Sequence, residues 1–161
     1  MTREQFKNIF DLYFEDIRRY LYYRCGDTAL STDLAQDTFM RIWEKQKILL
    51  PGKDAGLLYK IASDLFVSHT RRERLRKEAP DKISFELMDQ TPEEEMEYSE
   101  LKEKYERVLM KLPENQRVVF LMSRTEELTY KEIATRLSLS VKAVEKRMSG
   151  ALTRLRIELK S

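Results

Sequence analysis

The sequence has few of the residues that build disulfide bonds, metal sites or catalytic centres. Cys25 is the only cysteine, so no disulfide can form within the chain, and His69 is the only histidine, so no cluster with zinc-ligand spacing exists. We expect Cys25 to be reduced and partly buried and His69 to be a packed side chain. The sequence therefore predicts no metal site, no cofactor and no catalytic activity.

Glycine, proline and long apolar runs are scarce as well. Four glycines and four prolines in 161 residues, among many Leu, Lys, Glu and Arg, favour helices over strands, so we predict an all-α protein. No stretch approaches the roughly 18 uncharged apolar residues of a membrane span, and the first ten residues, MTREQFKNIF, lack the apolar core of a signal peptide. We expect a soluble, cytoplasmic protein.

The charge is small in total but unevenly distributed. Residues 1–80 carry 15 Lys and Arg against 12 Asp and Glu, residues 81–100 carry 1 against 8, and residues 101–161 carry 14 against 8. This pattern suggests two basic modules that meet polyanions, joined by an acidic segment that does not. We predict helical domains at 1–79 and 93–161 joined by a linker at 80–92, and we expect the acidic linker to leave the two domains mobile.

Periodicity and capping signals predict the helices of both domains. Thr91 with Glu94 and Thr129 with Glu132 have the spacing of capping boxes. Apolar residues at helical spacing predict helices at about residues 2–25, 31–46, 54–77, 92–111 and 114–124, followed by a helical pair within 128–156.

The helical pair lies in the stretch LTYKEIATRLSLSVKAVEKRMSGALTRLR, in which Ser140 is the natural cap of the second helix. One face of that second helix is apolar and is predicted to be buried, with Val144, Met148, Ala151 and Leu155. The opposite face combines basic with small residues. Cations neutralise phosphate and small residues let a backbone approach base edges, so this face is typical of a helix-turn-helix that reads DNA. A solvated helical hairpin is the alternative.

Two further stretches extend the argument to the whole chain. The segment LPENQRVVFLMSRTEELTYKEIATRLSLSVKAVEKRMSGALTRLR resembles the C-terminal, promoter-reading domain of bacterial sigma factors. STDLAQDTFMRIWEK, with Asp33, Gln36, Asp37, Phe39 and Trp43, and LLYKIASDLFVSHTRR resemble motifs of their N-terminal domain. The order of these motifs and the short linker are similar to the compact extracytoplasmic-function (ECF) subgroup.

Four positions depart from the family's pattern. Leu57 stands where the family has tryptophan, Asp64 where it has asparagine and Ser68 where it has aspartate, so the promoter sequence cannot be copied from relatives. Ser138 replaces the usual glycine of the helix-turn-helix turn, and we expect it to adopt a left-handed backbone at about 1 kcal/mol.

The resemblance implies an all-α ECF sigma factor that brings core RNA polymerase to promoters, with core polymerase, promoter DNA and an anti-sigma factor as partners. It implies that core polymerase, through its largest subunits, is bound by Asp33, Gln36, Asp37 and Met40. It implies contacts to the opened minus-ten element by Lys60, Asp64, Val67, Arg71 and Arg74. It implies contacts to the duplex minus-thirty-five element by Lys142, Ala143, Glu145, Lys146, Arg147, Ser149 and Gly150.

Some interpretations stay open at this point. The exposed carboxylates of residues 31–46 are compatible with a merely solvated face, or with the acid–base pair of a hydrolase. Tyr59 and Phe66 suit either the core or a platform on which single-stranded bases stack. A DNA-binding regulator that is not a polymerase subunit is the nearest alternative function, although the N-terminal half shows neither a dimer interface nor an effector pocket plainly.

Overall fold

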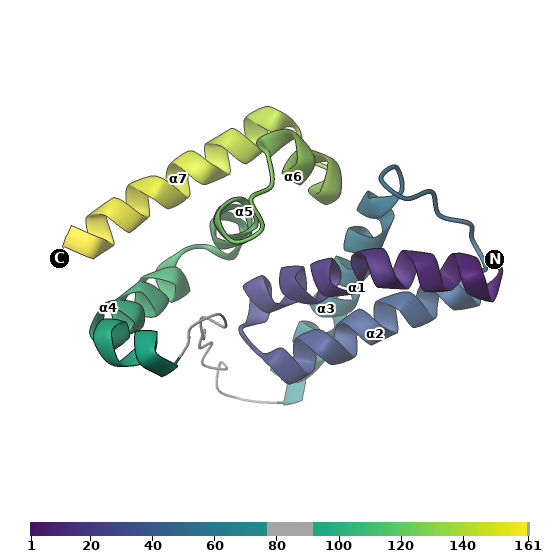
Figure 1. The fold of residues 1–161 in the computed structure, drawn as a ribbon, viewed down its shortest axis with the longest axis horizontal. Helices are drawn as coiled ribbons and strands as arrows, with labels where there is room; N and C mark the ends of the chain where they lie inside the picture. Colours follow the sequence, from purple (N-terminus) through teal and green to yellow (C-terminus); the bar gives the residue numbers. More distant parts are fainter. Residues whose placement is uncertain (77–91, 161) are drawn as a thin grey trace.

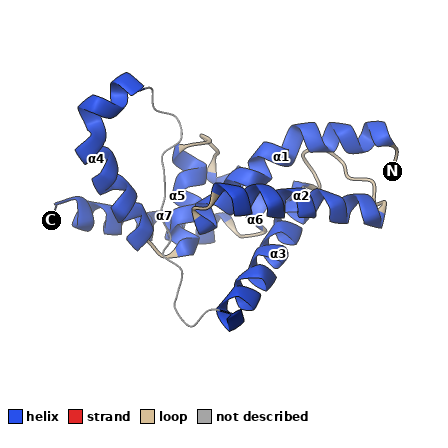
Figure 2. Ribbon diagram, turned by 90° about the horizontal axis from the view of Figure 1, so that it is seen from below, coloured by secondary structure: helices blue, strands red, loops and turns tan. Residues whose placement is uncertain are grey.

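The computed structural model describes residues 1–76 and 92–160, and the side chains of all of these except 92–98. The described residues form seven α-helices and no strand (Figures 1 and 2). These are α1 (Arg3–Cys25), α2 (Thr28–Lys45), α3 (Ala55–Arg76), α4 (Pro92–Lys111), α5 (Glu114–Arg124), α6 (Tyr130–Leu137) and α7 (Val141–Lys160). None of the described helices is long and apolar enough to cross a membrane.

The helix bounds follow the sequence prediction closely, with one correction. Helix α2 begins at Thr28 rather than near Ser31, because the Asp27 side chain accepts a hydrogen bond from the Leu30 amide at 3.1 Å and so caps the helix earlier. Its apolar periodicity begins only one turn later, so periodicity alone places the start too late. The capping box predicted at Thr91 and Glu94 lies outside the described residues.

The N-terminal domain is a bundle of α1, α2 and α3. Helix α1 packs against both of the others and ends at Gly26, whose left-handed backbone (φ 69°) lets its amide bond back to Tyr22. Fully buried side chains from all three helices meet in the core, among them Ile17, Leu21, Ile42 and Leu58. The charged residues distributed along this half of the sequence therefore lie on the outside of a helical bundle.

The C-terminal domain contains α4 to α7. Thr129 and Glu132 form the predicted capping box, with both of its hydrogen bonds at 3.1 Å, and the Ser140 hydroxyl accepts from the Ala143 amide at 3.1 Å at the start of α7. Ser138 has the expected left-handed backbone, with φ 57°. The four apolar residues predicted to face the core of α7 are all buried. The helix-turn-helix geometry is confirmed.

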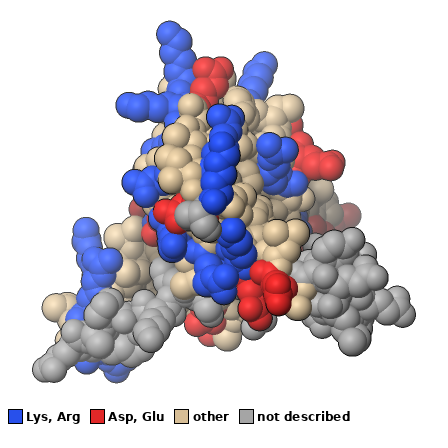
Figure 3. All heavy atoms as spheres, turned by 90° about the vertical axis from the view of Figure 1, so that its left-hand side faces the viewer, with Lys and Arg blue, Asp and Glu red and all other residues tan. Residues whose placement is uncertain are grey.

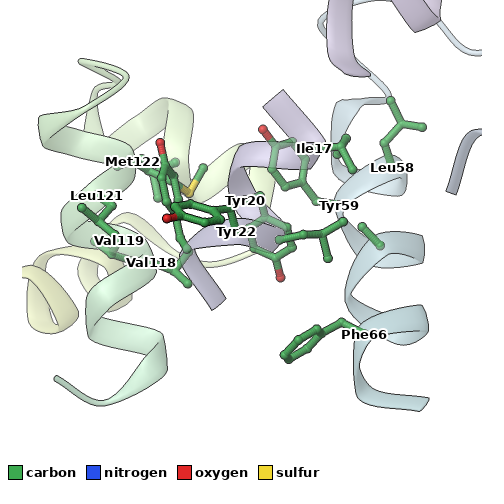
Figure 4. Packing of buried hydrophobic residues seen from close by; sticks show 14 of the residues in the cluster. Ile17, Tyr20, Tyr22, Leu58, Tyr59, Phe66, Val118, Val119, Leu121 and Met122 are labelled. Carbon is green, nitrogen blue, oxygen red and sulfur yellow. The ribbon is translucent and has the colours of Figure 1, made fainter. Parts of the chain in front are cut away.

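The two domains pack against each other, which is contrary to the expectation of mobile domains. Helix α1 contacts α5, and α3 contacts α6. Figure 4 shows Tyr20 and Tyr22 of α1 between the valines and Met122 of α5 on one side and Tyr59 of α3 on the other. The acidic charge of the linker predicts that the linker itself stays away from DNA. This charge does not predict whether the two folded domains contact each other.

Candidate nucleic-acid and protein interfaces

The predicted protein-binding residues form one exposed stripe on α2. Asp33, Gln36, Asp37 and Met40 are all exposed, with Met40 at 55%, and their spacing of three and four residues places them on one side of the helix. The opposite side, including Phe39, is buried in the bundle. An exposed methionine ringed by polar groups is typical of a surface that a partner covers.

The predicted minus-ten residues on α3 fall into two groups. Val67, Arg71 and Arg74 are exposed on the C-terminal half of the helix. Lys60 and Asp64 are also exposed, but they line a cleft between the two domains. The five residues therefore follow one helix, and its N-terminal half faces the other domain.

Tyr59 and Phe66 belong to the core, which resolves the alternative that the sequence leaves open. Their exposed fractions are only 2% and 8%. The ring of Tyr59 meets Tyr20 edge to face at 5.1 Å, and its hydroxyl accepts a hydrogen bond from Arg136 at 3.0 Å. The guanidinium of Arg24 lies 4.4 Å from the ring centre of Phe66. In this arrangement neither ring is free to stack on a base.

On α7 the predicted minus-thirty-five residues are mostly accessible. Lys142, Glu145, Lys146 and Ser149 are exposed, whereas Ala143 and Arg147 are half-buried. Figure 3, which views the molecule from the side of α4 and the C-terminal end of α7, shows more Lys and Arg than Asp and Glu on that side. Lys142 and Lys146 thus give the exposed side of α7 the basic character expected from the sequence.

Gly150 is the exception among these residues. A Cβ atom built on Gly150 would lie 2.6 Å from Nε2 of Gln116 on α5. Its small size therefore suits the packing of α5 on α7. The contact of Gly150 with DNA stays a prediction.

The cleft that separates the two predicted DNA-binding helices has a volume of about 620 Å³. Lys60 and Asp64 line it from α3, Arg147 lines it from α7, and Glu114 and Arg24 lie along it. Pockets of 300–1,000 Å³ accommodate roughly one drug-sized molecule. The cleft is too small to admit a DNA duplex between the two helices.

A buried arginine joins the domains at the end of α1. Arg117 of α5 is only 3% exposed, and its guanidinium donates to the carbonyls of Tyr23 at 2.8 Å and Arg24 at 2.9 Å. These carbonyls lie in the last turn of α1, where the helix leaves acceptors without partners and carries negative partial charge. Burial lowers the pKa of Arg117, but an arginine stays protonated at any physiological pH. One domain thereby caps a helix of the other.

A second contact surrounds Arg24 of α1. Its guanidinium forms an ion pair with Glu114 of α5 and donates to the Ser63 hydroxyl of α3 at 2.8 Å. It also covers Phe66, so this side chain of α1 contacts α3 of its own domain and α5 of the other domain. It was not singled out from the sequence, since periodicity alone places it only at the end of an amphipathic helix.

A third contact is a cluster of charges between α1 and the segment 126–136. Asp16 pairs with Arg136 at 3.4 Å, and Arg19 pairs with Glu126 at 3.4 Å and with Asp16 at 2.7 Å. Burial raises the pKa of the Glu126 carboxyl, and this effect exceeds the opposite effect of Arg19. Burial and the nearby Glu126 also raise the pKa of the Tyr23 hydroxyl. Desolvation thus outweighs ion pairing for Glu126.

Comparison with known proteins decides the family. A model of sigma-70 region 2 matches residues 9–76, and a model of sigma-70 region 4 matches residues 102–155. The two regions of this one family together account for most of the chain. The chain belongs to the sigma-70 family. It is an RNA polymerase sigma factor of the ECF type.

Relatives agree with this assignment. The sigma factor is 26% identical to the ECF RNA polymerase sigma factor SigM of Bacillus subtilis, over 95% of this chain and 91% of that protein. It is 28% identical to the RNA polymerase sigma factor YlaC of the same organism, over 98% and 91%. The solved structure of the sigma factor RpoE in complex with the anti-sigma factor NepR from Bartonella quintana has the same fold, with a TM-score of 0.69, 22% identity and 96% of each chain covered.

The family assignment bears on two alternatives left open by the sequence, the regulator that is not a polymerase subunit and the hydrolase. A DNA-binding regulator outside the polymerase would not account for the match of region 2 to the N-terminal bundle. Sigma factors are transcription initiation factors and not enzymes, so the carboxylates of α2 need no acid–base role. Within residues 1–76 and 92–160, no group of three or more His, Cys, Asp or Glu side chains is arranged to hold a metal ion.

Proposed function

We propose that this sigma factor binds core RNA polymerase through the α2 stripe of Asp33, Gln36, Asp37 and Met40. The observation that carries the proposal is the exposure of this stripe on a helix whose other side is buried. It combines three polar side chains with one exposed apolar side chain, and such a surface fits a mixed polar and apolar partner. The interaction takes place in the cytoplasm, where polymerase and promoter DNA are found.

We further propose that the domains divide the promoter between them. The N-terminal domain, residues 1–79, contacts the opened minus-ten element through the exposed side of α3, and the C-terminal domain, residues 93–161, contacts the duplex minus-thirty-five element through α7. The basic residues Arg71 and Arg74 support the first contact, and Lys142 and Lys146, all exposed, support the second. The acidic segment between the domains is repelled by DNA.

An anti-sigma factor is a further proposed partner. The similarly folded sigma factor of Bartonella quintana is seen in complex with one. The exposed stripe on α2 and the basic surface of α7 are the surfaces that such a partner has to cover to keep the sigma factor from polymerase and DNA.

The polymerase contact is tested by Asp37→Lys. Reversal of this exposed charge should weaken holoenzyme assembly at least about tenfold, because a close like-charge pair replaces an attractive one, while helicity and thermal stability stay unchanged. Asp11→Lys is the matched control, since Asp11 is an exposed carboxylate on the neighbouring helix α1. Pull-down with core polymerase and run-off transcription over a promoter library measure both. Equal core affinity for the wild type and Asp37→Lys would refute the α2 assignment.

A further inference from the structure

We propose that the cleft between the two domains binds a small phosphorylated molecule of nucleotide size. The inference goes beyond the proposed function, because it concerns the free factor without DNA or polymerase. The cleft has a volume of about 620 Å³ and is lined by side chains of α1, α3, α5, α6 and α7. Cavities of roughly 300–1,000 Å³ are the usual size of small-molecule sites.

Two cations and one carboxylate are left unpaired in this cleft. The charged side chains that line it are Arg24, Lys60, Asp64, Glu114, Arg136 and Arg147. Arg24 is already paired with Glu114. Arg136 is already paired with Asp16, at 3.4 Å. The remaining charges, two positive and one negative, give the cleft an excess of positive charge, and such a cleft attracts anions.

Lys60 and Arg147 are the cations without a partner. Neither side chain forms a hydrogen bond or an ion pair with any other residue that the structure describes. Lys60 belongs to α3 and Arg147 to α7, so the two charges reach the cleft from different domains. Arg147 is half-buried, and its planar guanidinium matches two oxygens of a phosphate with two parallel N–H donors. The pair of cations therefore favours a phosphate group.

Asp64 sets a second requirement for the ligand. It lies one helical turn beyond Lys60 on α3, and its carboxylate has no partner among the described residues either. A carboxylate repels phosphate but accepts hydrogen bonds from hydroxyl and amino groups. A ligand that suits both side chains carries phosphate at one end and O–H or N–H donors at the other. Nucleotides and sugar phosphates have this chemistry, and inorganic phosphate does not.

The shape of the cleft agrees with a ligand of this size. One end is closed where Gly56 approaches the helix-turn-helix: a Cβ atom built on Gly56 would lie 3.2 Å from the Thr135 carbonyl oxygen. From Gly56 to Asp64 the cleft follows α3 for eight residues, which is about 12 Å at 1.5 Å per residue. Val118 and Leu139 supply apolar contacts from the other domain. Such a mixture of apolar walls and a few polar groups is typical of small-molecule sites.

Titration calorimetry on the full chain at low salt tests the site, with ADP, pyrophosphate and adenosine as probes. One ADP should bind per chain. Adenosine should bind at least about tenfold more weakly, because it lacks the charged group that the two cations hold. Pyrophosphate should bind at least about threefold more weakly than ADP, because it offers Asp64 no donor.

Substitutions of the two cations locate the site. Lys60→Ala and Arg147→Ala should each weaken ADP binding at least about tenfold, since each removes a charge-assisted contact. Arg72→Ala on α3 and Arg156→Ala on α7 are the matched controls, because both are exposed cations of the same two helices outside the cleft. The controls should change the affinity by less than about twofold. Helicity and thermal unfolding without ligand should be those of the wild type in all four variants.

Asp64→Asn distinguishes the ligand class from simple attraction of anions. Loss of the negative charge should strengthen pyrophosphate binding, because a repulsive charge is removed. The same change should lower the preference for ADP over pyrophosphate at least about threefold, since an amide accepts less strongly than a carboxylate. An unchanged preference would overturn the assignment of a ligand with hydroxyl or amino donors.

Three further results would overturn the site. The first is the absence of ADP binding by the wild type, a result that does not depend on the folding of any variant. The second is equal binding of sulfate and ADP at the same ionic strength, which would mean non-specific attraction of anions. The third is displacement of ADP by a short single-stranded oligothymidylate at the same phosphate concentration, which would assign the cleft to nucleic acid. None of these measurements involves a promoter or core polymerase, so their failure leaves the proposed function unaffected.

Discussion

Replacement of Arg117 with alanine should open the two domains without unfolding either of them. The guanidinium donates two short bonds across the interface, at 2.8 and 2.9 Å, and one longer bond of 3.4 Å to Leu112 within its own domain. While the two domains are packed together, which is here called the closed state, alanine would leave the last carbonyls of α1 without this donor. In the open state, water satisfies the same carbonyls, so the penalty applies to the closed state alone.

The size of the effect is estimated from these contacts. A hydrogen bond to a charged group contributes about 1.5–3 kcal/mol. A cation at a helix C-terminus adds up to about 2 kcal/mol in a partly buried site. Desolvation of the guanidinium, which lowers the pKa of Arg117, offsets part of this gain. We expect a net loss of about 2–4 kcal/mol, which shifts the closed-to-open ratio by roughly 30- to 1,000-fold.

The assay is small-angle scattering together with thermal unfolding. Arg117→Ala should raise the radius of gyration at low salt, and Arg117→Lys should fall between, because a lysine is a point donor that cannot reproduce the forked geometry. Arg124→Ala is the matched control: it removes the same charge from the exposed side of α5 and should change neither measurement. If Arg117→Ala left the radius unchanged but lowered the unfolding temperature, Arg117 would only stabilise the fold, and the reasoning would fail.

The remaining predictions concern readout, pH and strain. Lys146→Ala should cost about 1–3 kcal/mol on the cognate upstream element and relax one base preference, whereas Arg154→Ala should weaken all sequences alike and lower the salt slope by about one phosphate; anisotropy titrations over a salt series distinguish the two. Burial raises the pKa of the Glu126 carboxyl. The contribution of Glu126 to the closed state is therefore fully present below the ordinary carboxyl pKa of about 4.3, and it is lost as the pH rises through the raised pKa. Acidification from neutral pH should therefore favour closure, and Glu126→Gln should remove that dependence in scattering; an unaltered pH profile would contradict the assignment. Ser138→Gly should raise the free energy of unfolding by about 1 kcal/mol in denaturant titration, because Ser138 has φ 57°; a loss of stability would mean that the hydroxyl makes a contact worth more than the strain.

Local features of this fold are predictable from the sequence because they depend on neighbours in the chain. The capping box at Thr129 and Glu132 and the buried face of α7 involve residues three or four positions apart, where geometry is set by the helix itself. The same holds for the exposed stripe on α2, whose four residues lie within eight positions. Helix type and helix faces follow from such short-range rules, whereas the left-handed backbone of Ser138 was expected from the resemblance to the family's helix-turn-helix turn.

Contacts between the domains are not predictable in this way. Tyr59 fits a core or a stacking platform equally well by periodicity, and only the proximity of Tyr20 and Arg136 decides between them. Gly150 has the small size expected of a groove-facing position, yet Gln116 of another helix occupies the space beside it. Arg117 lies in the stretch that resembles the family's C-terminal domain, but its partners across the interface lie more than 90 residues away in the sequence. Pattern reasoning identifies such residues and misses what they touch.

The position of the polar contacts suggests an order of events at a promoter. The α2 stripe is open to core polymerase while Arg117, Arg24 and Arg136 hold the domains together, so docking on polymerase does not have to compete with closure. Contact with DNA does compete, since Lys60 and Arg147 share one cleft. A free factor whose domains are packed together should therefore have little affinity for promoters on its own. Polymerase would separate the domains only if it bound the separated arrangement more tightly than the packed one. If so, core polymerase should lower the salt concentration at which the interface opens, because it favours the open state, whereas a minus-thirty-five duplex alone should not.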